Sequence, residues 1–217
     1  MKAVILGATS GIGQSIAQNL KGTCNKIVSL GSKDVDTSSL KSVKNFCKKY
    51  NGPDVLVLNT GGPPDLKFNK INNEIWIENF NKLFLSFSNI IKDIGIKENG
   101  YVFLISSYII KQPSDELIIS SSLRSGFNSL FKSLSIIYAK KNIKFINIAP
   151  GPIKTKRLIN LIKKDGSTLK NFERQLPGKK IPEANEIGKF VQFVVKNKII
   201  SLNGNTITFD SNLIKGL

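Results

Sequence analysis

Apolar residues occur along the chain in short runs separated by longer stretches of mixed character. The runs have the length of buried strands, and the stretches between them place apolar residues three or four positions apart, as one helix face does. Residues 39–50, for example, put Leu40, Val43 and Phe46 on one face. The alternation predicts a single α/β domain over residues 1–217, with a parallel sheet covered by helices on both faces. The runs expected as strands are 1–6, 26–30, 54–58, 101–105, 145–149 and 206–210.

The first expected strand leads into a glycine-rich turn and then a helix. The turn contains Gly7, Gly11 and Gly13, and residues 14–20 continue as an amphipathic helix. Glycine lets the backbone turn tightly and lets a phosphate approach where a Cβ would block it. The helix directs its free N–H groups and the positive end of its dipole at the same place. The pattern predicts a dinucleotide with its pyrophosphate over residues 11–13, and a plain structural turn is the alternative.

The glycine spacing resembles that of a known family of enzymes. Gly-x-x-x-Gly-x-Gly, with Ile12 between the last two glycines, is similar to the short-chain dehydrogenase/reductase pattern, although Leu6 stands where that family usually has threonine. The resemblance extends over the whole chain. It implies a Rossmann-type doubly wound parallel sheet and NAD(P)-dependent hydride transfer between a nicotinamide and a carbonyl or alcohol carbon of a small-molecule substrate.

The chain is shorter than the family pattern after the second strand. Family members usually have a helix and a third strand before an Asp-Val-type turn, but here residues 35–37 (Val-Asp-Thr) follow Leu30 almost directly. A crossover between parallel strands takes about a dozen residues. We therefore expect this helix to be absent and the third strand to be lost or reduced to an edge stub. The resemblance places Asp36 where it would accept from the adenine amino group.

The end of the second strand bears on the choice between NADP and NAD. An acidic residue there favours the free ribose hydroxyl of NAD, whereas Ser32 and Lys33 offer donors to a 2′-phosphate. We expect NADP, with NAD as the alternative. The resemblance adds cofactor contacts after later strands, including Asn59, which should also tie neighbouring strands together. The expected cofactor-binding residues are Gly7, Thr9, Ser10, Gly11, Ile12, Gly13, Ser32, Lys33, Asp36, Asn59, Thr60, Gly61, Arg124, Pro150, Gly151, Ile153 and Thr155.

The resemblance also locates the catalytic residues, and here the chain departs from the usual pattern. Ser107 follows a strand where the family has its substrate-binding serine. The family's Tyr-x-x-x-Lys is replaced by Ser120 and Arg124. An atypical branch of the family has a similar Ser-Asn-x-x-Arg pattern and a Thr-Gly-Gly-Pro-Pro loop like residues 60–64. Leu83 stands where the usual proton relay has an asparagine.

These replacements determine what chemistry the site can perform. A serine hydroxyl is a much weaker acid than a tyrosine, so Ser120 is a poor general acid, and loss of a positioned acid typically costs about 10²–10⁴-fold in rate. Arg124 can hold the ribose, orient an anionic substrate or stabilise an oxyanion. Tyr108 is either a substitute acid or part of the pocket wall. We predict an oxidoreductase with a modified proton relay. The alternatives are a cofactor-binding sensor or scaffold without turnover, and another enzyme type on this fold, such as a lyase or isomerase.

Composition narrows the range of partners. The chain has no histidine and two cysteines, so a histidine base is excluded and no metal site is expected. The net charge is +17, but nearly all of the 32 basic residues are lysine, whereas base readout relies on arginine. We therefore expect a solvated lysine surface and no nucleic-acid partner. The apolar runs are too short for a membrane span or a signal peptide, so we expect no membrane contact and a cytoplasmic location.

Three longer segments complete the expected fold. Residues 74–93 and 120–141 should form long helices, which by resemblance pair across a two-fold axis in a homodimer or homotetramer. Residues 156–181 are polar and should be irregular. By resemblance they occupy the place of a mobile lid over the substrate.

Overall fold

A six-stranded parallel sheet forms the centre of the molecule. The structure, a computed structural model, describes residues 1–216. The strands run in the order β2-β1-β3-β4-β5-β6, so the winding direction changes between β1 and β3. This arrangement confirms the predicted doubly wound sheet, and each strand lies within two residues of its predicted run. The strands are β1 (Lys2–Leu6), β2 (Lys26–Leu30), β3 (Val55–Leu58), β4 (Tyr101–Ile105), β5 (Lys144–Pro150) and β6 (Thr206–Phe209).

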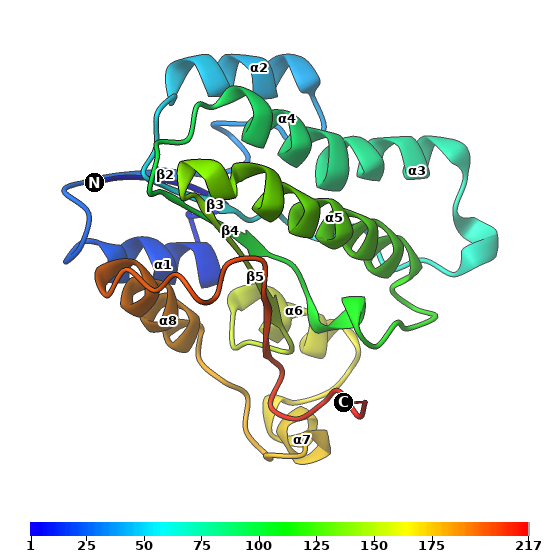
Figure 1. Cartoon of the computed structure of the whole chain (residues 1–217). Helices are drawn as coiled ribbons and strands as arrows, with labels where there is room; N and C mark the ends of the chain where they lie inside the picture. Colours follow the sequence, from blue (N-terminus) through cyan, green and yellow to red (C-terminus); the bar gives the residue numbers. More distant parts are fainter. Residues whose placement is uncertain (217) are drawn as a thin grey trace.

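Helices cover both faces of the sheet (Figure 1). One buried apolar cluster joins the sheet to α2 and to the two long helical segments, and a second joins the opposite face to α1 and α8. Strand residues alternate between the two clusters, because successive side chains point to opposite faces. The helices are α1 (Gly11–Leu20), α2 (Leu40–Lys49), α3 (Asn73–Phe80), α4 (Ser86–Asp93), α5 (Ile118–Ile137), α6 (Lys156–Lys164), α7 (Leu169–Gln175) and α8 (Ala184–Lys196).

Both predicted long helices are present. A π-helical turn at Asn81–Leu85 joins α3 to α4, and a 3₁₀ turn at Tyr138–Lys141 extends α5. Their outward surfaces expose apolar side chains, including Ile77 and Ile136. The pairing of these helices between copies of the chain stays a prediction.

The expected deletion is confirmed. Residues 31–39 form turns and no helix, and Leu40 then begins α2. Val35 is buried and packs into the same cluster as Val43 and Phe46. The short connection therefore closes the edge of the core that the missing helix and strand would cover in longer family members.

The lid segment differs from its prediction. Residues 156–181 were expected to be irregular, but they form α6 and α7. Thr155 and Thr168 cap these helices by accepting from backbone N–H groups. The two helices share a small apolar core of their own, centred on Ile162, Leu176 and Ile181. The polar average of the segment concealed apolar residues that recur at helical spacing.

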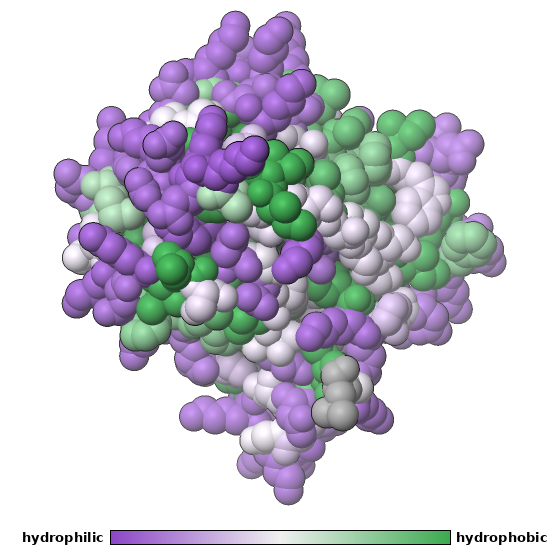
Figure 2. Space-filling view, in the orientation of Figure 1, coloured by the Kyte–Doolittle hydropathy of each residue, from purple (hydrophilic) through white to green (hydrophobic). Residues whose placement is uncertain are grey.

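The surface carries many lysines in exposed positions. Figure 2 shows hydrophilic residues over the upper part of the molecule, where Figure 1 places α2. Lys41, Lys44, Lys48 and Lys49 of this helix are all exposed. Within residues 1–216, none of the helices combines the length and apolar character needed to cross a membrane. The same residues contain no group of three or more metal-ligating side chains.

Candidate cofactor and substrate site

A cavity of about 820 Å³ lies at the carboxyl ends of the strands. Its lining comes from the segments that follow β1 to β5, from α5 and α6, and from single residues of α3, of the π-helical turn after it and of α7. In doubly wound folds ligands bind in this crevice, beside the point where the strand order reverses. The structure brings to this one cavity all the predicted site residues except two, Gly13 and Lys33.

The glycine turn fits a dinucleotide pyrophosphate. Gly7 and Gly11 have φ values of 60° and 56°, a conformation that favours glycine. Helix α1 begins at Gly11, and its N-cap residue Ser10 makes no side-chain capping bond. The first-turn N–H groups are therefore available to an anion at the positive end of the helix. Thr155 closes the other side, because its Cγ2 lies 3.1 Å from the place of a Cβ on Gly11.

Gly13 lies where a helix packs against the glycine turn. It does not line the cavity, and a Cβ on it would collide with the carbonyl group of Gly7 and lie 2.9 Å from Asn59 Nδ2. The same Nδ2 atom donates to the Gly7 carbonyl at 3.1 Å, which confirms that Asn59 ties the ends of β1 and β3 together. The missing side chain of Gly13 therefore lets α1 pack closely on this turn, and its contact with phosphate stays a prediction.

The end of β2 forms the part of the cavity where the adenosine is expected. Ser32 and Asp36 line it, whereas Lys33 does not, and a contact between Lys33 and the cofactor stays a prediction. The hydroxyl and backbone N–H of Ser38 donate to Asp36 at 2.7 and 2.9 Å, and these bonds lower the pKa of that carboxyl. Asp36 stays charged and is already oriented by the chain.

Ser32 and Lys33 can be separated experimentally. We expect Ser32→Asp to weaken NADPH binding roughly tenfold and NADH binding much less. The new carboxylate repels the 2′-phosphate, which only NADPH carries, and a repulsion of about 1.4 kcal/mol corresponds to a tenfold loss of affinity. Lys33→Glu introduces a larger change of charge outside the cavity lining and should have the smaller effect. Titration of both variants with both cofactors checks the order. A larger loss of NADPH affinity in Lys33→Glu than in Ser32→Asp would show that Lys33 contacts the cofactor.

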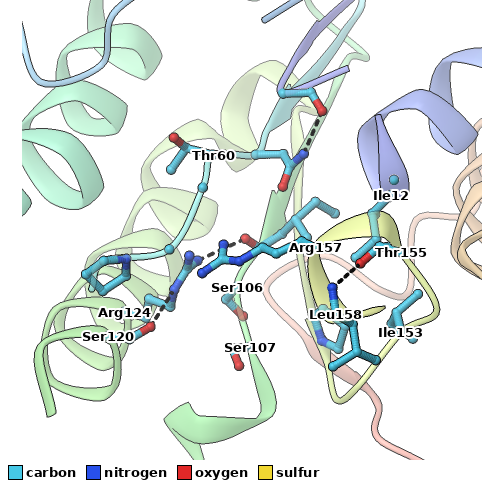
Figure 3. A pocket seen from close by; sticks show the side chains of 18 of the residues that line it. Ile12, Thr60, Ser106, Ser107, Ser120, Arg124, Ile153, Thr155, Arg157 and Leu158 are labelled. Carbon is cyan, nitrogen blue, oxygen red and sulfur yellow. Dashed lines mark hydrogen bonds between the residues drawn. The ribbon is translucent and has the colours of Figure 1, made fainter. Parts of the chain in front are cut away.

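The predicted catalytic residues meet at the end of β4 (Figure 3). Arg124 is only 8% exposed, and its Nε donates to Ser120 Oγ at 3.1 Å. Its Nη1 donates to the carbonyl of Ile105, the last residue of β4, at 3.2 Å. Ser106 donates to the sheet at the Ile148 carbonyl, whereas Ser107 makes no side-chain hydrogen bond within the described part of the chain. The Ser107 hydroxyl is therefore free to meet a substrate.

Burial lowers the pKa of Arg124 but leaves the side chain charged at neutral pH. Desolvation, and to a smaller extent the nearby charge of Arg157, together lower the pKa of its guanidinium to about 10. The group is still protonated at neutral pH. A buried cation with neutral hydrogen-bond partners is costly, so an anion that enters this cavity gains from it.

Sequence reasoning did not identify Arg157 as a site residue. It follows Thr155 at the start of α6 and lines the cavity. Arg157 reaches the cavity because α6 packs over the carboxyl ends of the strands, and the sequence alone does not predict how α6 packs. Tyr108 also lines the cavity, in keeping with the pocket-wall alternative.

Known proteins resemble this chain along most of its length. The sequence profile of the family described as enoyl-(acyl carrier protein) reductase matches residues 34–211. The 3-oxoacyl-[acyl-carrier-protein] reductase FabG of Buchnera aphidicola (subspecies Schizaphis graminum) is 29% identical, with 94% of this chain and 93% of the relative covered.

Solved structures resemble the fold. YwfH, an NADPH-dependent reductase involved in bacilysin biosynthesis, superposes with a TM-score of 0.87 at 19% identity, covering 100% of this chain and 99% of the other. L-Sorbose reductase of Gluconobacter frateurii, solved with NADPH and L-sorbose, gives 0.85 at 21% identity, covering 99% and 97%. At these identities the likeness establishes the fold alone.

Proposed function

The chain belongs to the short-chain dehydrogenase/reductase family of NAD(P)-dependent oxidoreductases, and we propose that it is an NADPH-dependent carbonyl reductase whose proton relay uses neither tyrosine nor lysine. The observation that carries this proposal is the arrangement of one cavity. An anion cradle lies at its α1 end, and Ser107, Ser120 and Arg124 converge at its β4 end. The names of the relatives and structural neighbours, which are reductases and in part NADPH-dependent, support the choice of cofactor and direction.

The residues of the chain divide the work as follows. The N–H groups of the first turn of α1 would hold the pyrophosphate, and Ser32 would contact the adenosine ribose. When bound, NADPH supplies a hydride to the carbonyl carbon of the substrate. Ser107 donates to the carbonyl oxygen, which takes up the electron pair of the broken π bond and a proton. We assign the proton to Ser120, because the Arg124 N–H that it accepts stabilises a serine oxygen that has lost its proton. Water then returns a proton to Ser120.

The proposal is tested by incubating the protein with NADPH and a panel of ketones, aldehydes and oxo acids. We expect loss of reduced-nicotinamide absorbance that depends on one class of carbonyl compound. Tight NADPH binding with no such loss for any class would contradict the proposal and favour a cofactor-binding sensor or scaffold.

The replaced Tyr-x-x-x-Lys pair favours that second candidate, and restoring the pair separates the two. If Ser120 and Arg124 form the working relay, Ser120→Tyr with Arg124→Lys should lose about 10²-fold or more of the parent activity, the usual worth of a positioned acid. The reason is that Arg124 then no longer donates to a serine oxygen. If the site is that of a reductase that has lost its catalytic tyrosine and lysine and no longer turns over, the parent is inactive and the double variant gains carbonyl reduction. Steady-state rates with the same panel distinguish these results.

A further inference from the structure

Arg157 reaches across the cavity from α6 to the loop that follows β3. A Cβ built on Gly62 would lie 2.7 Å from Arg157 Nη2 and 3.1 Å from its Nη1. The guanidinium therefore lies directly against Gly62, in space that any side chain at that position would occupy. Figure 3 shows the Arg157 and Arg124 side chains extending toward one another over Ser106.

The two guanidinium groups face the same cavity, and within the described residues neither forms an ion pair with the acidic residues that also line it, Asp36, Asp65 and Glu78. The ion pairs within residues 1–216 are Lys97–Asp54 and Lys154–Glu183, and neither involves an arginine. Arg124 is buried, and its hydrogen bonds to Ser120 and Ile105 use only two of its five N–H groups. Arg124 is buried whereas Arg157 is exposed. The charge of Arg157 still contributes to lowering the pKa of Arg124, so the two cations repel one another. An anion between them would relieve it.

The position of the pair indicates which anion this is. The pyrophosphate cradle lies at the α1 end, where Gly11 faces Thr155. Arg124 instead bonds the last carbonyl of β4, beside Ser107, at the end of the cavity where the substrate is reduced. A planar carboxylate accepts two parallel N–H bonds from a guanidinium, which gives geometric selection as well as affinity.

We propose that the substrate carries a carboxylate near its reducible carbonyl group, and that Arg157 and Arg124 hold this carboxylate. The inference rests on the proposed function and names the substrate class of the same site. A cofactor phosphate is the other source of an oxyanion, and the experiment separates the two.

The test compares pyruvate and acetoacetate, a 2-oxo and a 3-oxo acid, with their methyl esters. The wild-type protein, Arg157→Ala and Gly62→Ala are assayed for kcat/KM, for NADPH affinity, and by calorimetry for binding of each acid and ester to the NADP⁺ complex. Gly62→Ala displaces Arg157 without removing it, and the displacement is mild because the atoms met by the new Cβ are the far end of a flexible side chain. Lys163→Ala removes a charge from the exposed side of the same helix, away from the cavity lining, and serves as the matched control.

We expect at least one acid to bind and react at least tenfold better than its ester in the wild type and in Lys163→Ala. Arg157→Ala should lose roughly 10- to 100-fold for that acid, the worth of one charged hydrogen-bond set. Gly62→Ala should lose less, because it shifts the guanidinium without removing it. Both should leave the ester and NADPH affinity unchanged.

Three results would overturn the inference. They are failure of both acids to bind, equal losses for acid and ester, and a loss confined to NADPH affinity, which would assign Arg157 to the cofactor. If calorimetry shows Arg157-dependent binding of an acid but no carbonyl compound oxidises NADPH, the proposed function fails and the carboxylate site stands.

Discussion

Arg124→Met is expected to remove about 10²–10³-fold of kcat/KM, the usual cost of deleting one preorganised donor, while the fold remains at least as stable. Methionine is unbranched like the aliphatic stem of arginine, so the packing around that stem is largely kept while the guanidinium is removed. The substitution removes the donor that orients Ser120 and the charge that faces the substrate. It also removes a buried cation whose described hydrogen-bond partners are neutral oxygens.

The stability part of this prediction has a definite sign. Burial lowers the pKa of Arg124 to about 10, so at neutral pH the group is charged in both the folded and unfolded states. The fold bears the whole desolvation penalty there, and the penalty declines only as pH rises above about 10. Exchange of buried ionic groups for apolar ones is often neutral or stabilising. Urea denaturation at pH 7 should therefore give an unchanged or higher free energy of unfolding.

A control and a contradicting result complete this test. Arg174→Met makes the same change on α7 at an exposed position that does not line the cavity, and it should affect neither activity nor stability. Full activity in Arg124→Met would show that Arg124 serves packing only. A fall of more than about 1 kcal/mol in the free energy of unfolding would show that its two hydrogen bonds outweigh the desolvation of its charge.

Gly13→Ala is expected to have the largest effect on stability, because the added methyl group meets backbone. The new Cβ would collide with the Gly7 carbonyl group and lie 2.9 Å from Asn59 Nδ2. Overpacking of this kind typically costs about 1–3 kcal/mol or more. The turn that holds the cofactor would also shift, so NADPH affinity should fall together with stability.

Urea denaturation and NADPH titration check the Gly13 prediction. Gly22→Ala, just beyond the end of α1, is the matched control, because its Cβ would make an ordinary contact of 3.4 Å with Gln192 Nε2. It should leave both quantities nearly unchanged. Lost cofactor binding in Gly13→Ala with unaltered stability would instead support direct contact between this position and the phosphate.

The sheet and the deletion could be predicted because they depend on local signals. Buried strands of a parallel sheet are nearly continuous apolar runs, and the gap between Leu30 and Val35 is too short for a crossover helix. The helices of residues 156–181 could not be predicted in the same way. These helices are short and mostly polar, and they are stabilised by threonine caps and by a few apolar residues such as Ile162 and Leu176.

The predicted site residues were located mainly by where they follow the strands. The structure places all of them but Gly13 and Lys33 at one cavity, because parallel strands end at one edge. Contacts between residues that are distant in the sequence could not be predicted in this way. Gly13 faces the Gly7 carbonyl, and Arg157 rests against Gly62 more than ninety residues earlier in the chain. Sequence spacing contains no information on either distance.

The most direct test of the central claim is the fate of the transferred hydride. NADPH carrying deuterium at C4 on one face or the other is incubated with the protein and the reactive carbonyl compound, and the alcohol product is analysed by mass spectrometry. The account predicts that one of the two labelled cofactors gives a product with one added deuterium on the former carbonyl carbon, and that Arg124→Met lowers the yield. Binding of both labelled cofactors with no deuterium in any product would contradict it.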